Sequence, residues 1–312
     1  MLLPLEIFDL ILDDVATEQR MSKLMTTCSL VCHYFHSKAR IHIFSQIYLL
    51  VGTQEHCRRR AKKFLRILKY KKNADLISHC IRSVIILVEP SVPYWDGSEE
   101  DLPCSNSFLS LMGIDRNPIK TVLAKFMNAP IQELVLKRPS CYYRSAEFPY
   151  IWASGIVLLK MCSNPNLKTL RFEYINDLPL SFIRGSSHGR GFTRLALQGV
   201  TITNYWGEIS PMVFPAAARI ETLELVEMTS DQYLKVLDCL CPPPKSVYFQ
   251  NLKNMVVTVR HCYSREREEA WNVIFSAAGR LESLEIRLNT AYGDLDAGEV
   301  SLYFFVERIQ TC

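Results

Sequence analysis

A six-residue pattern of the form apolar-x-x-apolar-x-apolar recurs along the chain from residue 81 onward. Alternate side chains of a strand face the same way, so the last two apolar positions of each unit predict a short strand with one buried face. The units are 24 to 50 residues apart, which indicates stacked structural repeats with insertions in the longer intervals. The seven units cover residues 81–86, 131–136, 167–172, 192–197, 220–225, 244–249 and 281–286.

Helix signals lie between several of these units. Residues 117–129 carry apolar residues at helical spacing, Thr229 and Gln232 match a capping box, and residues 270–278 predict a third helix that ends at a glycine. Residues 91–107 hold the proline, glycine and acidic residues of a loop. Strands that alternate with helices predict an α/β fold, with a parallel sheet joined by helical crossovers.

The first 46 residues predict a small helical module. A first helix begins near Pro4 and carries two apolar stripes, and a second helix is expected from about residue 22 to 40. So short a module buries one stripe against its second helix and leaves the other for a partner. The stripes of the first helix are Leu3/Ile7/Leu10/Ile11 and Leu5/Phe8/Leu12/Val15, and the second helix carries Leu24, Cys28, Val31, Phe35 and Ala39 on one face.

A strand over residues 47–51 and a basic helix over residues 57–72 follow this module. Nine of the sixteen residues of the helix are Lys or Arg. Its apolar positions fall on one face, so the cations are expected on the other. The face of the helix that packs on the protein is expected to hold Cys57, Ala61, Phe64, Leu65 and Leu68.

The residues of the N-terminal module resemble the F-box, and more narrowly the F-box proteins abundant in fungi, in which a short F-box precedes irregular leucine-rich repeats. The resemblance covers about residues 3 to 46. It rests on Leu3-Pro4-x-Glu6-Ile7, on the block from Cys28 to Phe35, and on Ala39-Arg40 and Phe44.

The resemblance implies two domains and a function. Residues 1–46 are expected to form the F-box-like module, which would dock on the Skp adaptor of a cullin-RING (SCF-type) ubiquitin ligase. Residues 47–312 are expected to form an irregular leucine-rich-repeat-like solenoid that holds a target protein. Carried over by position, the adaptor contacts would come from Leu3, Pro4, Ile7, Leu10 and Ile11, with Val31 and Phe35 bracing the helices or extending the contact.

The sequence departs from this family at two places. Phe35 stands where the family often has Trp. The position three after each unit, often Asn or Cys in the family, is apolar here, so the turns lack a polar ladder for their backbone groups. These apolar residues are Ile175, Val200, Met228 and Leu252.

The outward positions of the predicted strands are the candidate surface for the target protein. Residues that flank the central apolar position of each unit face away from the core. The residues expected to contact the target are Arg171, Arg194, Glu224, Tyr248 and Glu285, with the tyrosine as anchor. The alternative function is a repeat scaffold that binds protein or nucleic acid without any ligase.

Composition narrows the class of protein. The 312 residues are 48% hydrophobic, and the net charge is +4, which is too small for a protein whose whole surface binds nucleic acid. Residues 1–80 nevertheless hold 13 basic and 7 acidic side chains. Eleven cysteines without regular spacing indicate reduced thiols, so we expect a cytoplasmic or nuclear protein. Apart from the N-terminal segment, the longest apolar stretch, residues 150–159, is about half as long as a bilayer span, so we expect a soluble protein without a membrane partner. The small net charge argues against a nucleic-acid partner.

No constellation in the sequence predicts an enzyme, a metal site or a cofactor. Residues 185–189 match Gly-x-Ser-x-Gly, but a strand rather than a helix is expected next, so a loop is the better interpretation. Cys28, Cys32, His33 and His36 resemble a zinc set, yet their helix face favours buried thiols. The run Arg58 to Lys63 is compatible with a nuclear import signal, a phosphate-binding strip or a solvated helix face.

Overall fold

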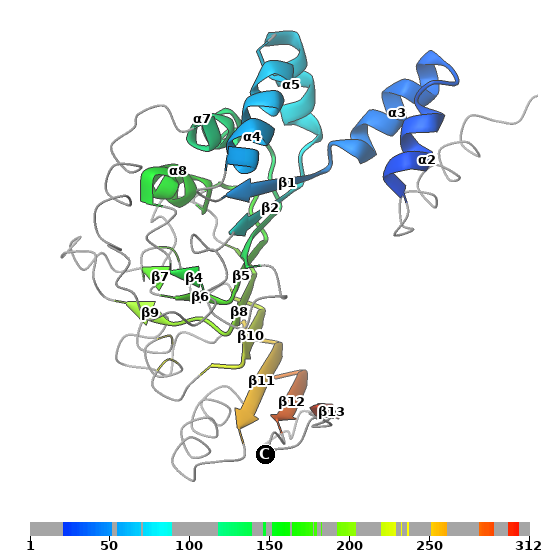
Figure 1. Cartoon of the computed structure of the whole chain (residues 1–312). Coiled ribbons are helices and arrows are strands. Elements are labelled where there is room, and N and C mark those ends of the chain that lie inside the picture. The colour runs from blue at the N-terminus through cyan, green and yellow to red at the C-terminus, as the bar shows by residue number, and fades with distance from the viewer. Residues whose placement is uncertain are drawn as a thin grey trace, which may run out of the picture.

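The fold is an α/β arrangement around one long sheet, seen in a computed structural model of the 312-residue chain (Figure 1). The structure describes residues 21–51, 55–69, 71–88, 118–138, 146–147, 152–162, 164–176, 178–179, 182, 192–203, 220–228, 232, 236, 251–260, 281–289 and 299–305. The expected first helix, the loop at 91–107, the Gly-x-Ser-x-Gly segment, the unit at 244–249 and the helix at 270–278 lie outside these residues.

Nine strands form the main sheet, and its order follows the chain. The first eight are parallel, and the ninth pairs antiparallel to the eighth. Short β4 (Ala146–Glu147), β6 (Ile175–Asn176), β7 (Leu178–Pro179) and β9 (Ile202–Thr203) make two separate pairs. The strands of the main sheet are β1 (Gln46–Val51), β2 (Ser83–Val88), β3 (Glu133–Lys137), β5 (Thr169–Glu173), β8 (Arg194–Gln198), β10 (Thr222–Val226), β11 (Asn254–Arg260), β12 (Ser283–Asn289) and β13 (Glu299–Phe305).

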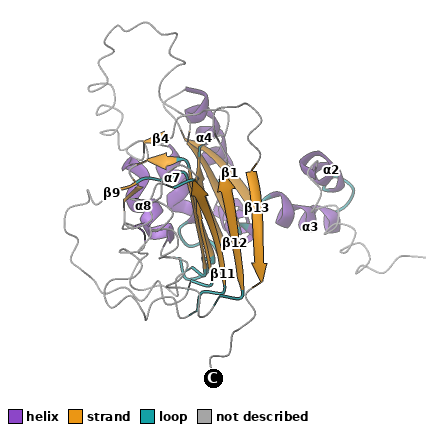
Figure 2. Ribbon diagram, turned by 90° about the horizontal axis from the view of Figure 1, so that it is seen from below, coloured by secondary structure: helices purple, strands orange, loops and turns teal. Residues whose placement is uncertain are grey.

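Among the described residues, the helices that follow β1 lie on one face of this sheet, beside its first strands (Figure 1). They are α4 (Glu55–Ile67), α5 (Lys71–Cys80), α7 (Pro118–Phe126) and α8 (Trp152–Cys162). Figure 2 shows α4, α7 and α8 on the same side of the strands. The helix expected at residues 117–129 and the apolar face of the basic helix are therefore confirmed, although the basic helix ends at Ile67 and a second helix begins at Lys71.

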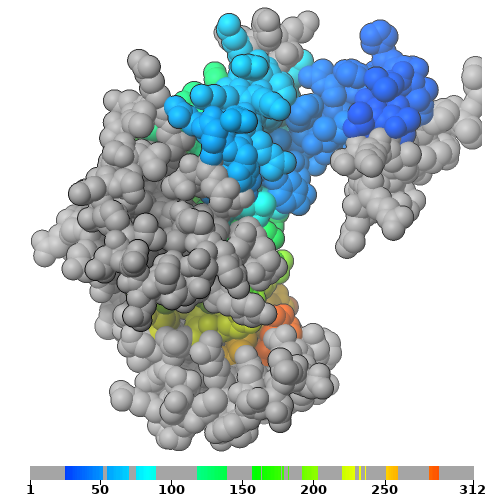
Figure 3. Space-filling view, in the orientation of Figure 1, coloured from blue at the N-terminus to red at the C-terminus, as the bar shows by residue number. Residues whose placement is uncertain are grey.

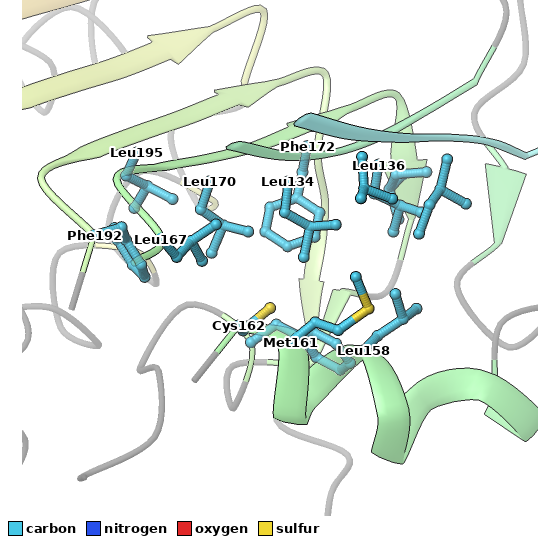
Figure 4. Close-up of a cluster of buried hydrophobic side chains, with 14 of the residues drawn as sticks. Leu134, Leu136, Leu158, Met161, Cys162, Leu167, Leu170, Phe172, Phe192 and Leu195 are labelled. Atoms are coloured by element: carbon cyan, nitrogen blue, oxygen red, sulfur yellow. The ribbon is translucent and has the colours of Figure 1, made fainter. Parts of the chain in front are cut away.

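The core lies between these helices and the sheet. Leu134, Leu170 and Leu195, the central apolar residues of three units, are at most 2% exposed and point toward α8 (Figure 4). Leu158, Met161 and Cys162 approach them from the helix. A fully buried aliphatic side chain contributes about 1.5–3 kcal/mol, so each buried position of the repeated unit stabilises the packing of the helices on the sheet.

One recurrent hydrogen-bond pattern joins each unit to the one before it. The two residues that follow the first apolar position donate both N–H groups to one carbonyl of the preceding strand segment. Gln132 and Glu133, for example, both donate to the carbonyl oxygen of Arg82, at 2.7 and 3.0 Å. The same arrangement follows at the acceptors Gln132, Lys168, Thr193, Glu221 and Lys253, and it starts at Ser45. This continuity explains why the strands keep one register across insertions of different length.

The turns after the strands correct one expectation. The apolar residues Ile175, Val200 and Met228 are buried, at 0%, 1% and 3% exposure. The backbone groups of these turns pair with the next turn instead of with a polar side chain, since Tyr174 N–H donates to Gln198 O at 2.7 Å and Gly199 N–H to Val226 O at 2.9 Å. These amides therefore have hydrogen-bond partners although the turns lack a polar ladder.

The expected single helix over residues 22–40 is two helices, α2 (Met21–Cys28) and α3 (His33–Ile43). The hydroxyl of Ser29 donates to the carbonyl oxygen of Thr26 at 2.6 Å, and Cys32 is extended, with φ −160° and ψ 170°. A serine that bonds the backbone in this way competes with the helix. The predicted stripe is therefore interrupted, and Val31 is 66% exposed.

Candidate functional site

The face of the sheet turned away from α7 and α8 is the candidate interaction surface. Its middle row runs from one strand to the next in register. The row consists of Tyr48, Ile85, Val135, Arg171, Ala196, Glu224, Val256 and Glu285. Side chains in this row are fixed about 4.8 Å apart by the strand spacing. The row divides into an apolar half on β1–β3 and a charged half from β5 onward.

The charged half is internally paired. Arg194 Nε lies 2.8 Å from an oxygen of Glu224 on the next strand. Arg171 pairs with Glu173 of its own strand, and Lys137 Nζ lies 4.0 Å from the same carboxylate. Arg287 Nε contacts Glu285 at 2.9 Å. Four of the five predicted target-binding residues, Arg171, Arg194, Glu224 and Glu285, are therefore engaged in ion pairs within the chain.

These pairs change what the charges offer to a partner. The side chains of Glu224 and Glu285 are only 14% and 15% exposed, whereas the arginine Arg194 is 49% exposed. Such solvent-accessible pairs contribute about 0–1 kcal/mol each to stability. A partner would have to break or bridge these ion pairs before it gained a charged contact. The charged half is thus a weaker candidate than its composition indicates.

The predicted anchor Tyr248 lies outside the described residues. The register position between Glu224 and Glu285 belongs to Val256 of β11. The strand there belongs to a unit at residues 252–257, whose Leu252, Met255 and Val257 are at most 1% exposed. The unit expected at 244–249 lies outside the described residues, and a second window of similar apolar pattern, residues 252–257, contributes to the strand between β10 and β12.

The apolar half is a surface that sequence reasoning missed. Tyr48 is 60% exposed, and Leu50 and Leu87 are half-buried beside it. Ile85 and Val135 continue the apolar strip but are 7% and 5% exposed. We call these five residues the apolar strip. The signal was present in the sequence, since residues 47–51 and 84–88 are apolar at almost every position, which indicates strands with two apolar faces.

The α2–α3 hairpin is the second candidate surface. Its own small cluster consists of Met25 and Ala39, with Phe35, Cys28 and Ile43 packed against them. The turn of the hairpin points Leu30 and Val31 outward, at 81% and 66% exposure. In Figures 1 and 2 the hairpin stands apart from the sheet, on the side opposite to α7 and α8.

The proposed adaptor residues are only partly described. Phe35 is half-buried and holds α3 against α2, while Val31 is available to a partner. The remaining adaptor residues, Leu3, Pro4, Ile7, Leu10 and Ile11, lie outside the described residues.

Two titratable groups have strongly shifted pKa values. Burial raises the pKa of the Cys162 thiol to about 12, so this core cysteine is an inert packing group. Burial, assisted by the neighbouring Glu227 carboxylate, raises the pKa of Tyr174 to about 12. The amide of Gln198 donates to the Tyr174 hydroxyl at 2.8 Å. Cys162 packs in the core, and Tyr174 is hydrogen-bonded to the neighbouring strand.

The described residues of the metal motif do not form a metal site, and the Gly-x-Ser-x-Gly segment lies outside the described residues. Among the residues that the structure describes, no group of three or more His, Cys, Asp or Glu side chains converges on a metal position. Cys32 and His36 are exposed, and Cys28 packs in the small cluster of the hairpin. Gln232, expected in a capping box, is buried, and its side-chain oxygen accepts the N–H of Ile202 at 2.6 Å.

Comparison of the chain with protein-family models, with curated proteins and with solved structures finds no match. Over the described segments, no helix has the length and apolar character that a membrane crossing requires.

Proposed function

We propose that this protein is a substrate-recognition subunit of an SCF-type (cullin-RING) ubiquitin ligase. In this proposal residues 1–46 dock on the Skp adaptor, and the solenoid of strands and helices that follows holds a target protein. The chain itself catalyses nothing, and transfer of ubiquitin is accelerated because the target is held near the catalytic subunits.

The observation that carries the proposal is the exposed turn of the α2–α3 hairpin. Two large aliphatic side chains, Leu30 and Val31, are largely exposed to solvent at the tip of a module that has its own small cluster. Adjacent exposed aliphatic groups of this size are typical of a surface that a partner covers. They lie within the segment whose motif resembles the F-box.

The sheet supports the second half of the proposal. The eight parallel strands in chain order create a long regular face, and such faces bind proteins in repeat folds. We assign the target contact to the apolar strip, because a tyrosine that is 60% exposed beside aliphatic residues makes a better anchor than ion-paired charges. Tyr48 thereby replaces Tyr248 as the proposed anchor, and Arg171, Arg194, Glu224 and Glu285 become rim residues.

A binding assay with the purified adaptor tests the proposal. The variant Leu30→Asp/Val31→Asp should lose at least about tenfold in affinity, since a carboxylate left unpaired in an apolar interface costs more than 1.4 kcal/mol. The matched control is Ile67→Asp/Leu76→Asp, which alters two exposed aliphatic residues on α4 and α5, at 46% and 42% exposure. The control should bind as the wild type does. Equal binding of both variants and the wild type would refute adaptor docking through the hairpin and favour a scaffold that works without a ligase.

A further inference from the structure

Helix α4 carries a dense array of positive charge that the proposed function does not use. Glu55 is the only carboxylate between residues 19 and 74, and it pairs with Arg59 at 3.4 Å. The array consists of seven exposed side chains on α4 and the turn after it: Arg58, Arg59, Arg60, Lys62, Lys63, Arg66 and Lys69.

The array is held in a fixed position. Cys57, Ala61 and Leu68 are at most 6% exposed and anchor the opposite side of the helix in the core. The ring of Phe64 lies 5.8 Å from that of Phe126 on α7, so α4 and α7 pack together. All seven cations therefore point to one outer surface, and the light-blue atoms of this region lie uncovered on the face seen in Figure 3.

One helix packed against α4 extends the positive surface, whereas α5, the next helix along the chain, carries the exposed carboxylate Asp75. Helix α7, which packs against α4, contributes Lys120 and the exposed Lys125 and holds no carboxylate.

This charge distribution is unfavourable for the helix alone. The pairs Arg58/Lys62 and Lys62/Arg66 are four residues apart, and like charges at this spacing repel each other. Cations near the start of α4 also meet the positive end of the helix dipole. An ordinary solvated face would alternate the signs of its charges. A bound polyanion reduces this repulsion by neutralising several of the cations together.

We propose that the outer face of α4 binds the phosphates of double-stranded nucleic acid without reading its sequence. Phosphate contacts need cations only, and they supply most of the affinity of non-specific binding. The helix is about 20 Å long, which lets its cations follow several successive phosphates. The expectation that nucleic acid is not a partner rested on the net charge of the whole chain. A duplex contacts only one surface, so the charge of the α4 face decides whether it binds.

Other polyanions fit this face less well. A protein partner would need an apolar or aromatic anchor at the centre of the contact. The exposed positions of α4 include no Phe, Tyr or Trp, and their one large aliphatic residue, Ile67, is the last residue of the helix. Single strands need stacking platforms for their bases, which the same positions do not provide. A membrane would require an apolar face to insert, and that face of α4 is buried in the core. A nuclear import receptor that reads an extended peptide would have to unfold the helix.

Fluorescence anisotropy with labelled 30-base-pair DNA and RNA duplexes of arbitrary sequence tests the proposal on the full chain. If about five phosphates are contacted, the slope of log K against log salt is about −4.5, and affinity falls roughly 500-fold between 50 and 200 mM salt. The variant Arg58→Glu/Lys62→Glu should lose at least about tenfold in affinity and flatten the slope by about two. The variant Arg58→Gln/Lys62→Gln, which repels no phosphate, should lose less.

The matched control is Lys160→Glu/Lys168→Glu, which changes the net charge equally at two exposed lysines outside α4. The control should bind both duplexes as the wild type does. An equal loss in the control would attribute binding to net charge and overturn the proposal. A slope near zero would overturn it too, as would a polyglutamate peptide or anionic vesicles that compete as well as the duplex. A preference of more than about tenfold for DNA or for RNA would contradict a surface that contacts phosphates only.

Discussion

Asn164 joins two successive crossovers, and its removal should destabilise the sheet. The residue lies in the turn between α8 and β5 and is 6% exposed. Its side-chain nitrogen donates to Ala129 O at 2.7 Å and to Met127 O at 3.3 Å, both in the turn between α7 and β3. Its side-chain oxygen accepts the N–H of Asn166 at 3.0 Å. One amide therefore satisfies backbone groups of two turns.

The magnitude follows from these three bonds. A hydrogen bond contributes about 1 kcal/mol net, and a buried carbonyl left without a donor costs about 1–3 kcal/mol. The Ala129 carbonyl keeps the N–H of Ile131 as a donor at 2.8 Å, so the variant loses one close and two weaker hydrogen bonds. Asn164→Ala should therefore lower the free energy of unfolding by about 1–3 kcal/mol. Asn164→Asp keeps the oxygen that accepts from Asn166 but places a carboxylate against two carbonyl oxygens, so it should be at least as harmful.

Urea unfolding followed by tryptophan fluorescence measures the effect as a shift of the midpoint at unchanged slope. The matched control is Asn166→Ala, whose exposed side chain contributes none of these bonds and which should change stability by less than about 0.5 kcal/mol. An Asn164→Ala variant within that margin of the wild type would refute the argument, as would an Asn164→Asp variant of full stability.

Three further predictions concern single groups. Gly199→Ala should lower the free energy of unfolding by about 1–3 kcal/mol, since φ is +56° and a new Cβ would lie 2.7 Å from a ring carbon of Tyr174. Thermal unfolding measures this loss. Adding Tyr174→Ala to the same chain should recover the part of the loss that comes from the steric clash. The pKa of Tyr174 is raised to about 12 by burial and by Glu227, so the folded protein keeps a proton that the unfolded chain releases near pH 10. Stability should therefore fall as pH rises from about 10 to 12, and the fall should be shallower in Tyr174→Phe. Iodoacetamide should label exposed Cys32 in the native state and leave buried Cys162 unlabelled until urea unfolds the protein; labelling of both at equal rates would contradict the packing.

The sheet was predictable because its signal is local and repeated. Each apolar-x-x-apolar-x-apolar unit indicates which side chains of its strand are buried. The helices predicted between units indicate that the strands are parallel. The strand after β10 could not be predicted, because residues 244–249 and 252–257 have similar apolar patterns. The structure shows that residues 254–260 pair with β10 and β12. The break between α2 and α3 was missed for a related reason, since apolar spacing continues through Ser29 while the backbone leaves the helix there and is extended at Cys32.

The candidate site was harder to predict than the fold. The sequence identified the outward positions but not the ion pairs between their side chains. The contact of Arg194 with Glu224, for example, requires β8 and β10 to be neighbours in the sheet. The apolar strip was overlooked because apolar residues in a strand were all assigned to the core. The positive charge of α4 could be read from the sequence. The structure shows that its seven cations are exposed while the opposite side of the helix is buried in the core.

The central claim is that the N-terminal module recruits a ligase adaptor. Light scattering coupled to size-exclusion chromatography of the full chain mixed with purified Skp adaptor measures this most directly. The account predicts a one-to-one complex with the wild type, and separate elution of the two proteins with Leu3→Ala/Pro4→Ala. A wild-type chain that elutes alone at micromolar concentration, or a variant that forms the complex undiminished, would contradict it.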